Sequence, residues 1–392
     1  MTMAPSRTAE SPARGWAARI AAGTPAHRDR TIDALRAVAI IGVILGHWMV
    51  SAVVSDQDHT SALHGASPLS HSPQLAPASW FLQTLGPFFF AGGYASARGL
   101  ANRRSLPWLS LRLSRLARPV LALAAVWVPA MLLLAAVGAP DSTRHVTRSL
   151  VSHPLWFLLV YIVLTAFAPL LRPLVVRAGA WAVLPMVALV ALTDAVRPHG
   201  LPLWWELLAV LAAWMVPYML GIALSESRLD RRAGTVLLAL GVFGGAVLLL
   251  GAGYPASAVG VPGDRWSNLD PPSLFAMALA FAQLGVFLLL RPWLARLLRR
   301  PAAWAPVAGL NLNAMTLFCW HQTALLLVTF AGLLVGPLPG LLDEPDGSWP
   351  LHRLAWLPLF ALVLVGLNRV FHRFESAGGP RRSPGPTKPV SP

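Results

Sequence analysis

The stretch that decides the fold is TIDALRAVAIIGVILGHW, residues 31–48. Arg36 and His47 bracket ten apolar or small residues, and ionisable groups inside a membrane helix are costly enough to indicate a function. Eleven steps of about 100° return His47 to within roughly 20° of the Arg36 face, about 16 Å further along the helix. Asp33 lies within reach of Arg36 on that face. The alternative is an Arg36 that extends to the lipid headgroups beside a histidine that only packs.

The composition favours an integral membrane protein. Of the 392 residues, 56% are hydrophobic and 12% are charged, whereas about a quarter of the residues in soluble domains are charged. The net charge of +15 does not indicate nucleic-acid binding, because the arginines collect in alternate loops, as the positive-inside rule expects. The single cysteine, Cys319, lies in an apolar run, so the sequence offers no disulfide framework and no thiolate metal site. We expect no bound metal or cofactor.

Hydropathy read in windows of about 20 residues predicts ten membrane spans. They lie near residues 34–54, 80–100, 116–138, 154–172, 179–196, 203–225, 233–252, 271–291, 312–336 and 351–371. We expect one all-α, polytopic bundle at residues 31–375. The flanking segments, residues 1–30 and the Pro/Gly-rich residues 376–392, are expected to be disordered tails, because neither can build a core.

The distribution of arginine predicts the orientation of this bundle. The connections at 55–79 and 337–350 contain neither lysine nor arginine, whereas the connection at 98–118 contains six arginines. Arginines also follow the sixth and eighth spans. Because Arg-rich connections face the cytoplasm, both termini and the Arg36 end of the first span are predicted to be cytoplasmic.

Three of these arginines, Arg112, Arg115 and Arg118, are spaced by three residues and so lie along one side of a helix. Guanidinium groups offer fixed pairs of donors that suit phosphate oxygens. The ladder predicts a binding site for a cytosolic donor with several phosphates, such as an acyl-coenzyme A. Asp33 would hold the guanidinium of Arg36 for the same donor. The alternative for any single arginine of the ladder is anchoring against anionic lipid.

The ninth span contains a second histidine, in the stretch LNLNAMTLFCWHQT at residues 310–323. His321 lies near mid-span, so we expect its depth in the membrane to resemble that of His47. A structural hydrogen bond between helices suits it as well as a catalytic role. Asn311, Asn313 and Gln322 add groups that need hydrogen-bond partners in lipid.

Two further residues are secondary candidates, Tyr94 and Asn268. Tyr94 follows Gly92 and Gly93, which would let another helix approach closely and would point the phenol into the bundle. Packing is the favoured role for the two glycines themselves. Asn268 lies in the loop GDRWSNLDPPSLF at residues 263–275, whose prolines also suit a simple helix start.

The chain resembles the membrane acyltransferase-3 family, bacterial multi-span enzymes that acylate surface carbohydrates and other acceptors. The resemblance is carried in family order by TIDALRAVAIIGVILGHW, PFFFAGGY, RLSRLARP, HPLWFLLVYI, SNLDPPSLFAMALAFAQLG, LFCWHQ and VFHRFE. Its most specific feature is the pair Arg36 and His47. The resemblance implies a ten-helix fold, an acyl-CoA donor used from the cytoplasm, and essential roles for that pair. The third-span arginines of the family are similar to Arg112 and Arg115.

Some positions depart from the family pattern. Gly92-Gly93-Tyr94 stands where the family often has Ser-Gly-Tyr or Ser-Gly-Phe, so that serine hydroxyl is missing. Phe318 stands where a tyrosine often precedes the ninth-span histidine, so no phenol at that position orients His321. We expect no second, hydrolase-like catalytic domain of the kind fused to some relatives.

The residues together with the resemblance favour an acyltransferase, and the resemblance implies a bacterial plasma membrane as its location. His47 would act as the general base on an acceptor hydroxyl, since imidazole titrates near neutral pH, and Arg36 would position the donor. The resemblance implies that the acyl group is acetyl and that the acceptor is a cell-surface carbohydrate, a glycolipid or a related molecule. Two other functions stay open: a proton-coupled transporter that uses the same intramembrane pair, and a non-enzymatic scaffold for the export of surface polymer.

Overall fold

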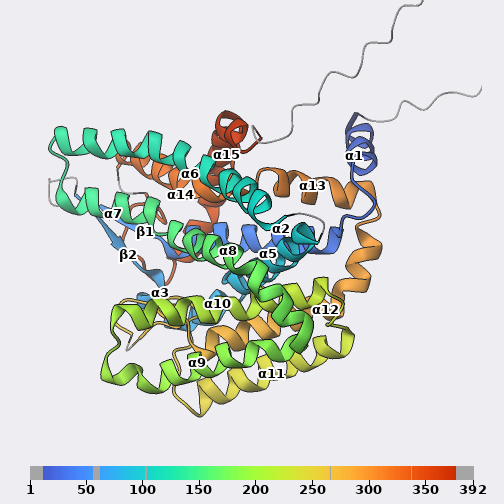
Figure 1. Cartoon of the computed structure of the whole chain (residues 1–392). Coiled ribbons are helices and arrows are strands. Elements are labelled where there is room, and N and C mark those ends of the chain that lie inside the picture. The colour runs from blue at the N-terminus through green and yellow to red at the C-terminus, as the bar shows by residue number, and fades with distance from the viewer. Residues whose placement is uncertain (1–11, 56–61, 102–103, 265, 337, 377–392) are drawn as a thin grey trace, which may run out of the picture.

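The computed structural model describes residues 12–55, 62–101, 104–264, 266–336 and 338–376. Long helices pack together in one bundle, and two short strands form an antiparallel hairpin (Figure 1). The predicted all-α class is confirmed. Of the two predicted tails, residues 1–11 and 377–392 lie outside the described chain.

The first half of the described chain contains α1 (Pro12–Ala22), α2 (Arg30–Val50), β1 (Ala52–Ser55), β2 (Leu63–Ala66), α3 (Pro68–His71), the 3-10 helix η1 (Pro73–Ala78), α4 (Ser79–Leu82), α5 (Leu85–Leu100), α6 (Ser105–Ala136), α7 (Asp141–Ser152) and α8 (Leu155–Ala178). The second half contains η2 (Gly179–Val183), α9 (Leu184–Val196), η3 (Arg197–His199), α10 (Leu203–Ser225), α11 (Arg231–Leu250), α12 (Leu274–Leu297), α13 (Pro301–Leu312), α14 (Ala314–Leu333) and α15 (Trp349–Ser376).

Eight stretches of the described chain are long and apolar enough to cross a membrane. One of these stretches, Asp141–His199, combines α7, α8 and α9. Helix α5 is not among the eight, because its 16 residues are fewer than the ~20 that a bilayer requires. On α11, Leu240, Phe243 and Val247 are each more than half exposed, at 55%, 72% and 66%, as side chains that face lipid would be. The protein is a multi-pass membrane protein. The count of ten spans and the side of the termini stay predictions.

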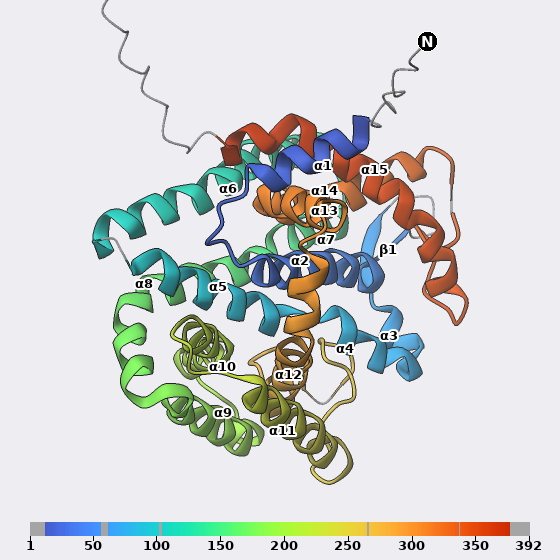
Figure 2. The same cartoon turned by 90° about the vertical axis from the view of Figure 1, so that its right-hand side faces the viewer.

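Helix α2 lies at the centre of the bundle. Figure 2 shows α2 between α5 on one side and α13 and α14 on the other, and α2 contacts all three. Burial is deepest in α10 and α14, where 72% of the apolar segment is buried, against 11% in α15. A Cβ atom at Gly93 would strike the carbonyl oxygen of Tyr218, and one at Gly221 would strike that of Phe90. These glycines therefore let α5 and α10 pack backbone to backbone.

The connections between helices gather at two ends of the bundle. The hairpin end holds β1–β2 and the loops before α12 and α15: the backbone amide of Ser55 donates to the Leu342 carbonyl at 3.0 Å, and His64 lies 3.1 Å from Glu344. The opposite end holds the start of α2 and the end of α12, where Arg30 donates to the Leu298 carbonyl at 2.8 Å. The connections at 55–79 and 337–350, which contain neither lysine nor arginine, thus meet at the hairpin end.

Several elements differ from the predicted boundaries. The segment expected to be an N-terminal tail contains α1, because Ile20 and Ala21 find apolar partners around Trp304. The second predicted span is interrupted before α5, where the hydroxyl of Thr84 donates to the Ala39 carbonyl at 2.7 Å. The third span begins at Ser105 and so includes the arginine ladder, and a separate helix, α13, precedes the ninth span.

Candidate active site

A cavity of about 870 Å³ lies at the opposite end, among α2, α5, α6, α8 and the α13–α15 region. Its basic lining residues are His27, Arg36, Arg98, Arg112 and Arg115. The acid among the described lining residues, Glu375, accepts from the backbone amides of Met315 and Thr316 at 3.1 and 2.9 Å, so it caps the start of α14. Positive charge therefore dominates the cavity, which favours an anionic ligand.

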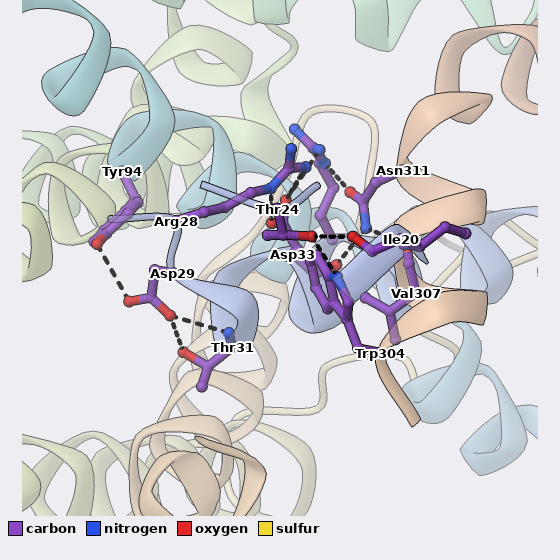
Figure 3. Close-up of polar contacts among 11 residues, drawn as sticks. Ile20, Thr24, Arg28, Asp29, Thr31, Asp33, Tyr94, Trp304, Val307 and Asn311 are labelled. Atoms are coloured by element: carbon purple, nitrogen blue, oxygen red, sulfur yellow. Dashed lines mark hydrogen bonds and ion pairs between the residues drawn. The ribbon is translucent and has the colours of Figure 1, made fainter. Parts of the chain in front are cut away.

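Arg36 is held in the cavity wall by two groups. Its guanidinium lies 3.2 Å from the Asp33 carboxylate, which also pairs with Arg28 at 2.5 Å. Its Nε donates to the side-chain oxygen of Asn311. The amide nitrogen of Asn311 donates to the carbonyls of Asp33 and Val307 at 2.7 and 2.8 Å (Figure 3), which leaves only its oxygen for Arg36. These contacts fix the direction of the guanidinium.

Two arginines of the predicted ladder line the same cavity, and the third does not. Arg112 donates from Nη2 to the hydroxyl of Tyr161 at 2.7 Å, while its buried Nε has no hydrogen-bond partner in the described part of the chain. Arg115 also lines the cavity, whereas Arg118 is not among its lining residues. Tyr161 could not be connected with Arg112 from sequence, because they lie 49 positions apart on different helices.

The two predicted histidines come together at the other end of α2. The ring centroids of His47 and His321 are 5.1 Å apart. His321 Nδ1 lies 2.6 Å from the Phe318 carbonyl, and because a carbonyl only accepts, Nδ1 carries a hydrogen, so in the neutral imidazole Nε2 keeps a lone pair. That Nε2 is buried and has no hydrogen-bond partner among the described residues. Gln322 Nε2 lies 3.4 Å from His47 Nδ1.

A buried arginine anchors the end of α2 that carries His47. Arg353 is fully buried, and it donates to the carbonyls of Trp48, Ser51 and Gly340 at 2.8, 2.5 and 2.9 Å. The indole of Trp48 in turn donates to the His321 carbonyl at 2.9 Å. Arg353 was not predicted from the sequence. The available signal was an arginine three residues after the 337–350 connection, which contains neither lysine nor arginine, so the positive-inside rule does not explain it.

The remaining candidates lie away from the histidine pair. Tyr94 donates to Asp29 at 3.2 Å, and Asp29 also accepts from Arg291 at 2.7 Å. Burial raises the pKa of Asp29, but hydrogen bonds from Thr31 and Arg291 outweigh it and hold this pKa below its ordinary value. Asn268 is fully buried in the loop before α12, where its side chain bonds the Pro255 and Ser257 carbonyls and the Ser273 hydroxyl.

No group of three or more histidine, cysteine, aspartate or glutamate side chains that could hold a metal ion occurs among the described residues. The fold and the site define a class: a helical multi-pass membrane protein with an arginine-lined cavity at one end of a central helix and a histidine pair at the other end. A family model, that of the acyltransferase domain of the acyltransferase-3 family, matches residues 29–368. The chain belongs to this family and is a membrane acyltransferase. Searches of curated proteins and of solved structures give no match.

Proposed function

We propose that the protein transfers an acyl group, expected to be acetyl, from cytosolic acyl-CoA to a hydroxyl of a cell-surface carbohydrate, glycolipid or related acceptor. The observation that carries this proposal is the arrangement along α2. Arg36 shares a cavity with Arg112 and Arg115, and His47 lies eleven residues further along the same helix, about 16 Å away along its axis. An extended donor would bind with its phosphates at the arginines and its thioester near the histidines.

The cavity supports the choice of a phosphate-bearing donor. Arginine stays charged and presents donors in a planar fork that matches phosphate oxygens. Asp33 and Asn311 direct Arg36 towards the cavity, and the buried Nε of Arg112 has no hydrogen-bond partner within the described residues. Because Arg36 lies so far from His47, its role is to position the donor, and stabilisation of charge on the reacting thioester falls to groups near the histidines.

His47 is the proposed general base. The hydroxyl oxygen of the acceptor attacks the thioester carbon as its proton passes to the imidazole. The carbon–sulfur bond then breaks, and the CoA thiolate takes up that proton, which returns the histidine to its neutral form. His321 is a second candidate for this proton, because its Nε2 keeps a lone pair and its ring is 5.1 Å from that of His47.

The proposed orientation in the membrane is based on the charges at the cavity end and at the hairpin end of the bundle. The cavity end carries Arg36, Arg98, Arg112 and Arg115, which favour the cytoplasm, where acyl-CoA is made, and the hairpin end carries the connections at 55–79 and 337–350, which contain neither lysine nor arginine. The plasma membrane of a bacterium is the proposed location, with the acceptor reaching the histidine pair from the hairpin end. Lipid and the acceptor are the proposed partners, together with acyl-CoA.

A comparison of parental and deletion strains tests the proposal, with surface glycans and lipids analysed by mass. We expect one class of molecules to lose an acyl group in the deletion strain. Complementation with the parental gene should restore it, whereas Arg36→Ala should not. Arg36→Lys, which keeps the charge without the fork, should restore it in part. Identical glycans and lipids in both strains, with no acyl-CoA consumed by the purified protein, would contradict the proposed reaction.

A further inference from the structure

Three phenylalanines separate the arginine-lined cavity from the histidine pair. Phe88 of α5, Phe157 of α8 and Phe318 of α14 all line the cavity. Their rings are in contact, with centroids 4.8 Å apart between Phe88 and Phe157 and 5.2 Å apart between Phe157 and Phe318. Both contacts are edge-to-face, the arrangement that aromatic pairs prefer. The rings therefore form one continuous apolar surface contributed by three helices.

The histidines lie behind this surface. The ring of Phe318 is 5.9 Å from that of His321, which is 5.1 Å from that of His47. Neither histidine is among the described residues that line the cavity. A donor bound at the arginines therefore meets phenylalanine rings before it meets His47.

The phenylalanine surface is also connected to the arginines. Arg112 donates to the hydroxyl of Tyr161, and the ring of Tyr161 lies 5.4 Å from that of Phe88. A phosphate that draws Arg112 towards the cavity would thus disturb the packing of Phe88. Phe318 has less freedom, because its own carbonyl accepts the hydrogen bond of His321.

We propose that Phe88, Phe157 and Phe318 form a barrier that admits the uncharged thioester arm of the donor to the histidine pair and excludes water and the charged phosphates. The inference rests on the proposed donor. Its chemical reason is that an apolar arm can replace ring contacts, whereas water and charged groups cannot enter an apolar site without losing hydrogen bonds. The barrier would thus determine that the acyl group goes to the acceptor hydroxyl and not to water.

Thiol labelling tests the barrier without any acyl-CoA. The single cysteine is first removed as Cys319→Ala, and His47→Cys is introduced. A charged methanethiosulfonate is then applied in vesicles from the side onto which the cavity opens. We expect Phe157→Ala and Phe318→Ala each to raise the labelling rate at position 47 by at least about tenfold, equivalent to ~1.4 kcal/mol in the barrier. Phe157→Leu, which leaves a smaller void, should raise it less.

Two controls make this experiment decisive. Phe287→Ala removes a phenylalanine of equal burial, 5% exposed like Phe318, from α12 and away from the cavity, and it should leave the labelling rate at position 47 unchanged. Arg36→Cys should be labelled rapidly with or without the barrier. An unchanged rate in the Phe157 and Phe318 variants, or an equal rise in Phe287→Ala, would overturn the inference.

A second measurement separates this inference from the proposed function. With His47 intact and no acceptor present, Phe157→Ala and Phe318→Ala should release CoA from acetyl-CoA at least about tenfold faster than the parent, because water reaches the thioester. If labelling changes while no variant consumes acyl-CoA, the proposed donor is wrong and the barrier stands. If the labelling rate at position 47 does not change in the Phe157 and Phe318 variants, the proposed barrier is wrong, whatever the rate of CoA release.

Discussion

Replacing Asn311 with alanine is expected to weaken donor binding without stopping the chemistry. The amide nitrogen of Asn311 is committed to the carbonyls of Asp33 and Val307, so its oxygen is the group that orients Arg36. A hydrogen bond to a charged group contributes about 1.5–3 kcal/mol. If that bond serves to aim the guanidinium at the donor, its loss raises the Michaelis constant for acyl-CoA by roughly tenfold to hundredfold.

The assay is the release of free CoA thiol by purified protein over a range of acetyl-CoA concentrations. Asn313→Ala is the matched control, because Asn313 donates to the Gly309 carbonyl at 2.8 Å, accepts from Asn368 and is not among the cavity-lining residues. We expect the Asn313 variant to keep the parental Michaelis constant. A parental constant in Asn311→Ala, or a fall in turnover alone, would refute the positioning role of Asn311.

The other predictions concern the donor, the fold and the orientation. Arg112→Ala and Arg115→Ala should each raise the Michaelis constant for acyl-CoA by about tenfold to hundredfold and leave that for the acceptor unchanged; equal constants for the donor would make them topology signals only. Arg353→Met should lower the unfolding temperature in detergent, since each buried carbonyl that loses its donor costs about 1–3 kcal/mol; an unchanged temperature would argue against the anchor. Single cysteines at Ser267 and Asp346, at the hairpin end, should react with an impermeant thiol reagent on intact cells. Single cysteines at Ser105 and Arg231, at the cavity end, should react only after permeabilisation, and the reverse pattern would invert the orientation.

The sequence predicts the site best where one helix carries it. The period of the α-helix places Asp33, Arg36 and His47 on one face, and the ion pair between Asp33 and Arg36 is present at 3.2 Å. The spacing of Arg112 and Arg115 likewise predicts that they share a side, and both line the cavity. Periodicity within a helix is a local property, so the side chains that share one face can be predicted without knowledge of the tertiary fold.

Contacts between distant segments could not be predicted in this way. The spacing of Tyr94 does not predict that its hydroxyl donates to Asp29, because this contact depends on how α5 packs beside the start of α2. Nothing in the spacing of Asn311 or Arg353 indicates that one holds Arg36 and the other caps α2. The pairing of His47 with His321 depends on how α2 packs against α14, which hydropathy does not determine.

The most direct measurement of the central claim is the acyl transfer rate of His47→Ala. Removal of a positioned general base typically lowers the rate by about 10²–10⁴-fold, and we expect a loss of that size with normal membrane insertion and an unchanged unfolding temperature. His199→Ala, at an exposed histidine beyond α9, should keep the parental rate. A near-parental rate in well-folded His47→Ala would contradict the assignment of His47 as the base.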